Sequence, residues 1–228
     1  MSITQLEQWL KDAGYEYHCF VSYPRIQKSD GHVDEAHPIT LCARQVKDAL
    51  VERLRFSIPK PQVYLDVDLG GGVDWETRLR GALCRSLVMV AICSGIYYHP
   101  SHEWCGIEWA AMDALGQRRL RGSDLRNIFP LMIKRETSLP PAAVCIPLWR
   151  DVSGATLTRQ YYTTKEFKRY IAEIVDHIEK VAEAMHQRDA QSGCGQFAFP
   201  RTSAFANWQS PGQEFPLTGK RASGDSDG

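Results

Sequence analysis

Residues 87–93 have the sequence LVMVAIC, in which every side chain is apolar. A strand with one face in water alternates apolar and polar residues, whereas a strand covered on both faces shows no alternation. This run therefore predicts the central strand of a parallel sheet that has helices packed on both faces.

Shorter runs of strand length lie on both sides of this stretch, and helical patterns separate them. Residues 17–23 (YHCFVSY) and 63–66 precede it, and residues 127–133 (NIFPLMI) and 144–148 (VCIPL) follow it. Five strands alternating with helices predict an α/β fold with a flavodoxin-like, doubly wound, five-stranded parallel sheet. The expected helices cover residues 40–55, 75–83, 101–115 and 165–186, with Thr40, Ser101 and Thr164 at their starts.

The pattern delimits one domain and a tail. We expect the domain over residues 15–186, with a helix over residues 2–13 packed on it. Residues 187–228 are rich in Gly, Ser and Pro, a composition typical of a flexible tail. Its segment 197–208 nevertheless carries aromatic side chains that are costly to leave in water, so packing against the domain and disorder both stay open. These aromatic residues are Phe197, Phe199, Phe205 and Trp208.

Composition and charge exclude several classes of protein. The chain has 27 basic and 27 acidic residues, so it lacks the cationic surplus typical of nucleic-acid-binding proteins. No apolar run approaches the roughly 18 residues that span a membrane, and the first residues do not resemble a signal peptide. The seven cysteines are scattered and form no C-x-x-C pair. We therefore expect buried free thiols, a cytoplasmic protein, and neither nucleic acid nor a membrane as a partner.

Chemically useful side chains cluster where the expected strands end. Ser22, Tyr23 and Arg25 lie at the end of the first strand, and Asp66 and Asp68 at the end of the second. Carboxyl ends of parallel strands meet at one edge of a sheet, where doubly wound folds bind ligands.

The helix after the central strand places Glu108 four residues after Trp104, on the same helical face. Apolar residues follow Glu108 (WAAM), which indicates a carboxylate in a partly dry environment. His99, His102 and Cys105 could suggest a metal site, but no second ligand cluster supports it, so we expect no metal.

Three of these segments together resemble the TIR (Toll/interleukin-1 receptor) domain family. The first is the S-Y ending of the first strand, and the second is the stretch from Asp66 to Leu83 (DVDLGGGVDWETRLRGAL). The third is S-x-x-W-C-x-x-E, from Ser101 to Glu108, in the helix after the apolar strand. Trp104 and Glu108 also match the W-x-x-x-E pattern of bacterial members. The resemblance covers about residues 15–186.

The resemblance implies an enzyme that cleaves the nicotinamide–ribosyl bond of NAD+, as a hydrolase or an ADP-ribosyl cyclase. It makes Glu108 the catalytic residue and the glycine loop at residues 67–73 a mobile loop that closes over NAD+. NAD+ is then the substrate, and no resident cofactor is implied. The expected substrate-binding residues are Ser22, Tyr23, Arg25, Asp68, Leu69, Trp75, Tyr97 and Trp104.

The resemblance further implies a homo-oligomer formed through TIR–TIR contacts, a separate sensor or effector protein, and a role in bacterial anti-phage defence. Two alternatives stay open. One is a non-catalytic TIR scaffold, and the other is a relative of the nucleoside (deoxy)ribosyltransferases, which also use a single carboxylate.

Overall fold

The computed structural model describes residues 3–29, 32–66, 75–133, 140–144, 150–151 and 161–208. Its centre is a parallel sheet in the order β2-β1-β3-β4-β5. The strands β1 (Tyr17–Ser22), β2 (Val63–Leu65), β3 (Ser86–Cys93) and β4 (Ile128–Met132) form its body. Every residue of β3 is buried. The prediction of an α/β protein with a parallel sheet built around this strand is confirmed, and the strand order is compatible with a flavodoxin-like fold.

The last strand differs from the sequence prediction. Pro141–Val144 forms the short helix α5, and β5 is the pair Arg150–Asp151, which lies parallel to β4. The expected strand at residues 144–148 is therefore wrong at Val144, and residues 145–149 lie outside the described part. A proline at the first helical position favours a helix, because its φ angle is preset and its missing N–H is not needed there.

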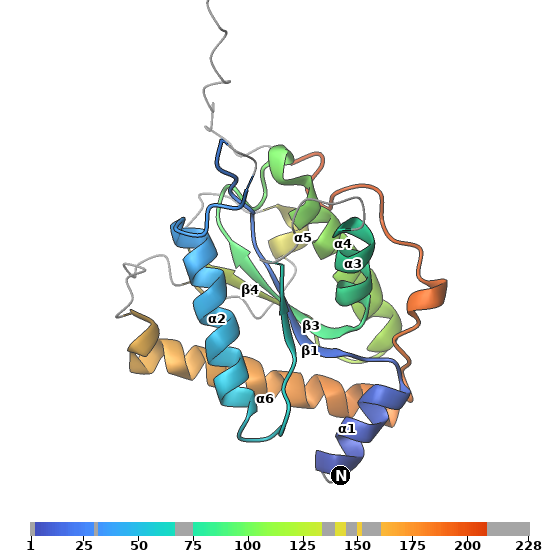
Figure 1. The fold of residues 1–228 in the computed structure, drawn as a ribbon. Coiled ribbons are helices and arrows are strands. Elements are labelled where there is room, and N and C mark those ends of the chain that lie inside the picture. Colours follow the sequence, from blue (N-terminus) through green and yellow to red (C-terminus); the bar gives the residue numbers. More distant parts are fainter. Residues whose placement is uncertain are drawn as a thin grey trace, which may run out of the picture.

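Helices cover both faces of the sheet (Figure 1). The helices α1 (Ile3–Asp12), α2 (Pro38–Leu54) and α6 (Lys165–Gln187) share a core with one face of the sheet. The helices α3 (Trp75–Cys84) and α4 (Glu103–Arg119) pack on the other face. Their buried side chains hold the carboxyl ends of β1, β2 and β3 at one edge of the molecule. No helix within the described ranges is long and apolar enough to cross a membrane.

Two helix starts lie at His-Pro pairs instead of at the expected hydroxyl residues. His37 caps α2, its Nδ1 accepting a hydrogen bond from the Ile39 N–H at 3.2 Å, so Thr40 lies inside the helix. His99 likewise caps the single turn η1 (Pro100–His102) that precedes α4, with Ser101 inside that turn. Thr164 caps its helix as expected, accepting from the Phe167 N–H at 3.2 Å.

The chain after α6 returns across α3 and α4, and Figure 1 shows this segment in orange and red. Phe205 is buried, with its ring 5.0 Å from the Tyr98 ring and 5.5 Å from the Trp109 ring. The N–H of Ala204 donates to the carbonyl of Gly106 on α4 at 3.0 Å. A side chain at Gly106 would overlap Ser203, so the close approach requires glycine there. Of the two possibilities left open for the aromatic segment 197–208, the structure shows packing against the domain.

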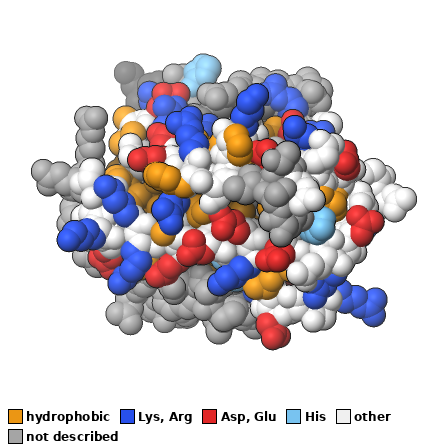
Figure 2. Space-filling view, turned by 90° about the horizontal axis from the view of Figure 1, so that it is seen from below, with side chains coloured by type: hydrophobic (Ala, Val, Ile, Leu, Met, Phe, Trp, Pro, Cys, Tyr) orange, Lys and Arg blue, Asp and Glu red, His pale blue; other side chains and the backbone are white. Residues whose placement is uncertain are grey.

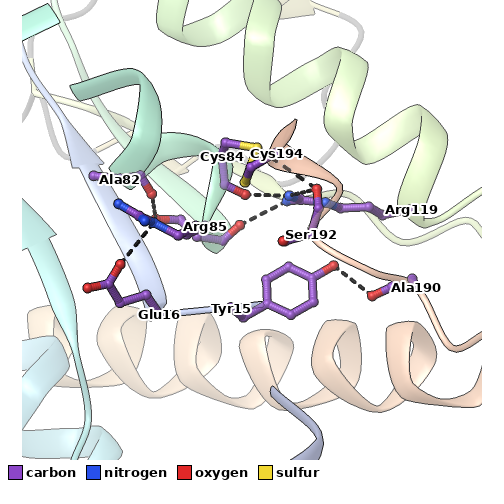
Figure 3. Close-up of a disulfide and its surroundings, with 10 residues drawn as sticks. Tyr15, Glu16, Ala82, Cys84, Arg85, Arg119, Ala190, Ser192 and Cys194 are labelled. Atoms are coloured by element: carbon purple, nitrogen blue, oxygen red, sulfur yellow. Dashed lines mark hydrogen bonds and ion pairs between the residues drawn. A yellow bond between two sulfur atoms is a disulfide. The ribbon is translucent and has the colours of Figure 1, made fainter. Parts of the chain in front are cut away.

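A disulfide fastens this segment at its beginning. Cys84, the last residue of α3, is bonded to Cys194 (Figure 3). The expectation of free thiols is wrong for this pair, whereas Cys19, Cys42, Cys93 and Cys105 are buried and free. The two bonded cysteines are 110 residues apart in the sequence, so no local sequence pattern predicts the bond between them.

The buried Arg119 ties the same region together through its guanidinium group (Figure 3). It donates to the carbonyls of Ser86 at 3.0 Å and Ser192 at 2.8 Å, and also to that of Cys84. Its guanidinium carbon lies 5.0 Å from the centre of the Tyr15 ring. The cation thereby joins the start of β3, the end of α3 and the returning segment.

We expect the double variant Cys84→Ala, Cys194→Ala to lose about 4 kcal/mol of unfolding free energy, because the disulfide closes a loop of over one hundred residues in the unfolded chain. Denaturant unfolding measures the loss. As a control, a reductant should lower the midpoint of the wild type but not that of the double variant. Equal midpoints for the wild type with and without reductant would contradict the bond.

Candidate active site

The carboxylate of Glu108 lies in the buried second turn of α4. Residues 105–109 of this helix are all buried, because the returning segment covers the side that an ordinary surface helix exposes. Glu108 itself is 7% exposed. A carboxylate in such a place needs hydrogen-bond donors or a cation nearby, because desolvation penalises its charged form.

One hydroxyl group donates to this carboxylate, and a second hydroxyl group is bonded to the first. The Oγ of Ser22, at the carboxyl end of β1, donates to Oε2 of Glu108 at 2.5 Å. The hydroxyl of Tyr97 lies 2.8 Å from the same Oγ. A serine hydroxyl has one proton, so when Ser22 gives it to Glu108, the Tyr97 hydroxyl donates to Ser22. Both hydroxyl residues are fully buried, and the result is a directed chain from Tyr97 through Ser22 to Glu108.

The protonation of this chain is set mainly by burial. Desolvation raises the pKa of Glu108 to about 7, against the opposing effects of the Ser22 hydrogen bond and the nearby Arg25. Desolvation also raises the pKa of Tyr97 well above its usual range, so its phenol keeps its proton. Glu108 therefore titrates near neutral pH, whereas its donors do not.

A second group of residues lies beside this chain. Arg25 forms an ion pair with Asp66, which follows β2 and is buried. The Tyr23 hydroxyl donates to the backbone carbonyl of Asp66 at 3.2 Å. The guanidinium carbon of Arg25 lies 5.2 Å from the centre of the Trp75 ring. These contacts hold one cation near Glu108 without pairing it directly to that carboxylate.

An aromatic wall continues from Trp75. Its ring meets the Trp104 ring edge-on at 4.8 Å, and both side chains are only partly buried. Arg80 lies over the Trp104 ring at 5.8 Å and over the Phe199 ring at 5.2 Å. Half-exposed indole rings beside a buried carboxylate form a surface on which a flat aromatic ring could stack.

The structure brings together most of the residues selected from the sequence. Ser22, Tyr97 and Glu108 form one hydrogen-bonded chain, and Tyr23, Arg25, Trp75 and Trp104 lie in the adjoining contacts. Asp68 and Leu69, with the glycine loop at residues 67–73, lie outside the described residues.

Two features of the site were missed. Asp66 was expected at this edge but without a role, and it holds Arg25. Phe199 reaches the wall from the returning segment, which no local pattern indicates. Among the described residues, His99, His102 and Cys105 do not form a group that could bind a metal ion.

Comparisons with protein-family models, with curated proteins and with solved structures find no match to this chain. The functional argument therefore depends on the geometry of the site and on the sequence resemblance.

Replacing Glu108 with Gln should stabilise the protein increasingly as pH rises. In the wild type the folded state holds the Glu108 proton up to about pH 7, whereas the unfolded state loses it near 4.5. The free energy of unfolding of the wild type therefore falls by about 3 kcal/mol as pH rises from 4.5 to 7. The Glu108→Gln variant has no proton to lose there and avoids this decrease. Unfolding curves of both proteins from pH 4.5 to 8 measure this. A constant difference across that range would show that Glu108 has an ordinary pKa.

Proposed function

We propose that the chain is a TIR-type NAD+ nucleosidase, with its catalytic domain over residues 15–186. The observation that carries the proposal is the buried Glu108 carboxylate, whose pKa of about 7 lies near the working pH. It is held by Ser22 and Tyr97 and lies next to an aromatic wall and the cation of Arg25. This arrangement suits a substrate that combines flat rings, phosphates and a reacting ribose.

The chemistry of NAD+ requires only one carboxylate. The C–N bond to the ribose breaks with its electron pair leaving on the nicotinamide nitrogen, so the pyridinium departs as a neutral ring and needs no proton. Positive charge develops on the ribose, as in glycoside hydrolysis, and a water or a substrate nitrogen then bonds to that carbon. Glu108 would stabilise the developing charge, and Ser22 would hold its carboxylate in a fixed orientation.

The remaining residues would bind the dinucleotide. Trp75 and Trp104 would stack on a base or on the nicotinamide ring, and Arg25 would meet a phosphate oxygen by sharing its donors with Asp66. In the same proposal the enzyme is cytoplasmic, assembles through TIR–TIR contacts and serves anti-phage defence. The resemblance supports the assembly and the role in defence. The cytoplasmic location follows from the expectation of free thiols, which holds for Cys19, Cys42, Cys93 and Cys105 but not for the Cys84–Cys194 pair.

We expect Glu108→Gln to reduce nicotinamide release from NAD+ by a factor of about 10² to 10³ or more, because a preorganised charge of this kind contributes that much to the rate. The matched control is Glu103→Gln, an exposed glutamate on the same helix, which should keep the wild-type rate. Chromatography of the products after incubation with NAD+ measures both.

Three outcomes would contradict this assignment. Unchanged turnover in folded Glu108→Gln protein would show that the carboxylate takes no part in the reaction. Release of a base from nucleosides but not from NAD+ would favour the ribosyltransferase alternative. No release from NAD+ at any protein concentration would favour the scaffold.

The Ser22 hydrogen bond predicts a shift in the pH profile. The ionised form of Glu108 is the active one, so kcat/KM should rise with pH and level off above about 7. Ser22→Ala removes a hydrogen bond that lowers the pKa of Glu108, so the rise should move to higher pH. Ser101→Ala, at an exposed serine, should leave the profile in place. A shift to lower pH, or an equal effect of both substitutions, would refute the role of Ser22.

A further inference from the structure

A cavity lies at the opposite end of the sheet from Glu108. It has a volume of about 390 Å³ and is lined by residues of α1 and α6, by the first residues of β1 and β3, and by the loop after α2. Figure 2 shows this end of the molecule, where acidic and basic side chains lie among hydrophobic ones. Its volume falls within the range of small-molecule sites, and none of its lining residues belongs to the site around Glu108.

The interior of the cavity is apolar. Leu10, Leu87, Ile178 and Ala182 line it, and each of these side chains is buried. Together they would exclude water from a ligand of matching shape. An apolar interior with a few polar groups at fixed positions is typical of ligand sites.

One of these polar groups is the imidazole of His18, which is 8% exposed. The Gln62 N–H donates to its Nδ1 at 3.0 Å, so the ring proton of the neutral form lies on Nε2. Burial lowers the pKa of His18 to about 4, and the ring is therefore neutral at pH 7. Within the described part of the chain, Nε2 is buried without a hydrogen-bond partner. Buried donors of this kind nearly always have an acceptor, so the ring lacks one that a ligand could supply.

The other polar groups are carboxylates. Glu179 and Glu183 lie one helical turn apart on α6, and Glu7 of α1 lines the same cavity. Like charges at this spacing repel each other. Among the described residues none of the three is in an ion pair, and the cavity has no lysine or arginine in its lining. The lining of the cavity therefore has a net negative charge.

We propose that this cavity binds a small organic cation. Its apolar body would occupy the space between α1, α6 and the sheet, and its protonated amine would lie near Glu7, Glu179 and Glu183. An oxygen of the ligand would accept the hydrogen bond of His18 Nε2. The site is independent of the Glu108 site and of the function proposed for it.

Tyramine is a suitable probe, because it has an aromatic body, a protonated amine and a phenol oxygen. We expect saturable binding at millimolar concentration or below in isothermal titration calorimetry with the full chain. N-acetyltyramine has the same body without the charge and should bind about five- to tenfold more weakly. Equal affinity for the two compounds, or no saturable binding of tyramine, would overturn the proposal.

The double variant Glu179→Gln, Glu183→Gln tests the location. Because both side chains are at the surface, it should fold normally, and it should weaken tyramine binding about five- to tenfold. Asp176→Asn, an exposed carboxylate on α6 that does not line the cavity, is the matched control and should leave the affinity unchanged. In ¹⁵N NMR spectra, the Nε2 resonance of His18 should shift on saturation. Equal effects of the two variants, or an unmoved His18 resonance, would overturn the proposed site.

Discussion

The hydrogen bond from Ser22 to Glu108 is the interaction on which the site depends. It joins the end of β1 to the second turn of α4, two elements between which the chain forms α2, β2, α3, β3 and η1. A carboxylate can be buried there only because donors meet it, and Tyr97 completes the chain of donors behind Ser22. The parallel sheet makes this meeting possible, because it brings the ends of β1 and β3 to the same edge.

The segment after α6 covers the outer side of the helix that carries this carboxylate. Without it, the outer side of α4 would face water at Gly106 and Trp109, where Ala204 and Phe205 now pack. The disulfide and Arg119 fix the start of the segment, and the aromatic contacts fix its end. The cover over α4 therefore depends on contacts made nearly one hundred residues later in the sequence, and burial is the main cause of the raised pKa of Glu108. The buried carboxylate of Glu108 lowers the free energy of unfolding at neutral pH, and functional sites commonly destabilise a protein in this way.

The sequence predicts the features of this protein that depend on local pattern. The unbroken apolar run predicted β3. The apolar residues around Glu108, four residues after Trp104, predicted that its carboxylate is buried. What it could not predict depends on partners distant in the chain. The Cys84–Cys194 bond and the pairing of Arg25 with Asp66 leave no trace in spacing. The His-Pro helix starts are a different case, because they could have been predicted. Proline is common at the first helical position, but the prediction placed the caps at the nearby residues Thr40 and Ser101 instead.

The charges around Glu108 also bear on which substrate the site would favour. Arg25 and Asp66 neutralise each other, so the net charge of Arg25, Asp66 and Glu108 together follows the protonation of Glu108. With Glu108 protonated the group is neutral, and with Glu108 ionised it carries one negative charge in a dry environment. A cation placed beside it would favour the ionised form and lower its pKa. The pyridinium ring of NAD+ brings such a charge, and bond cleavage moves it to the ribose. A neutral nucleoside would bring no such charge, so its binding would not lower the pKa of Glu108 in this way.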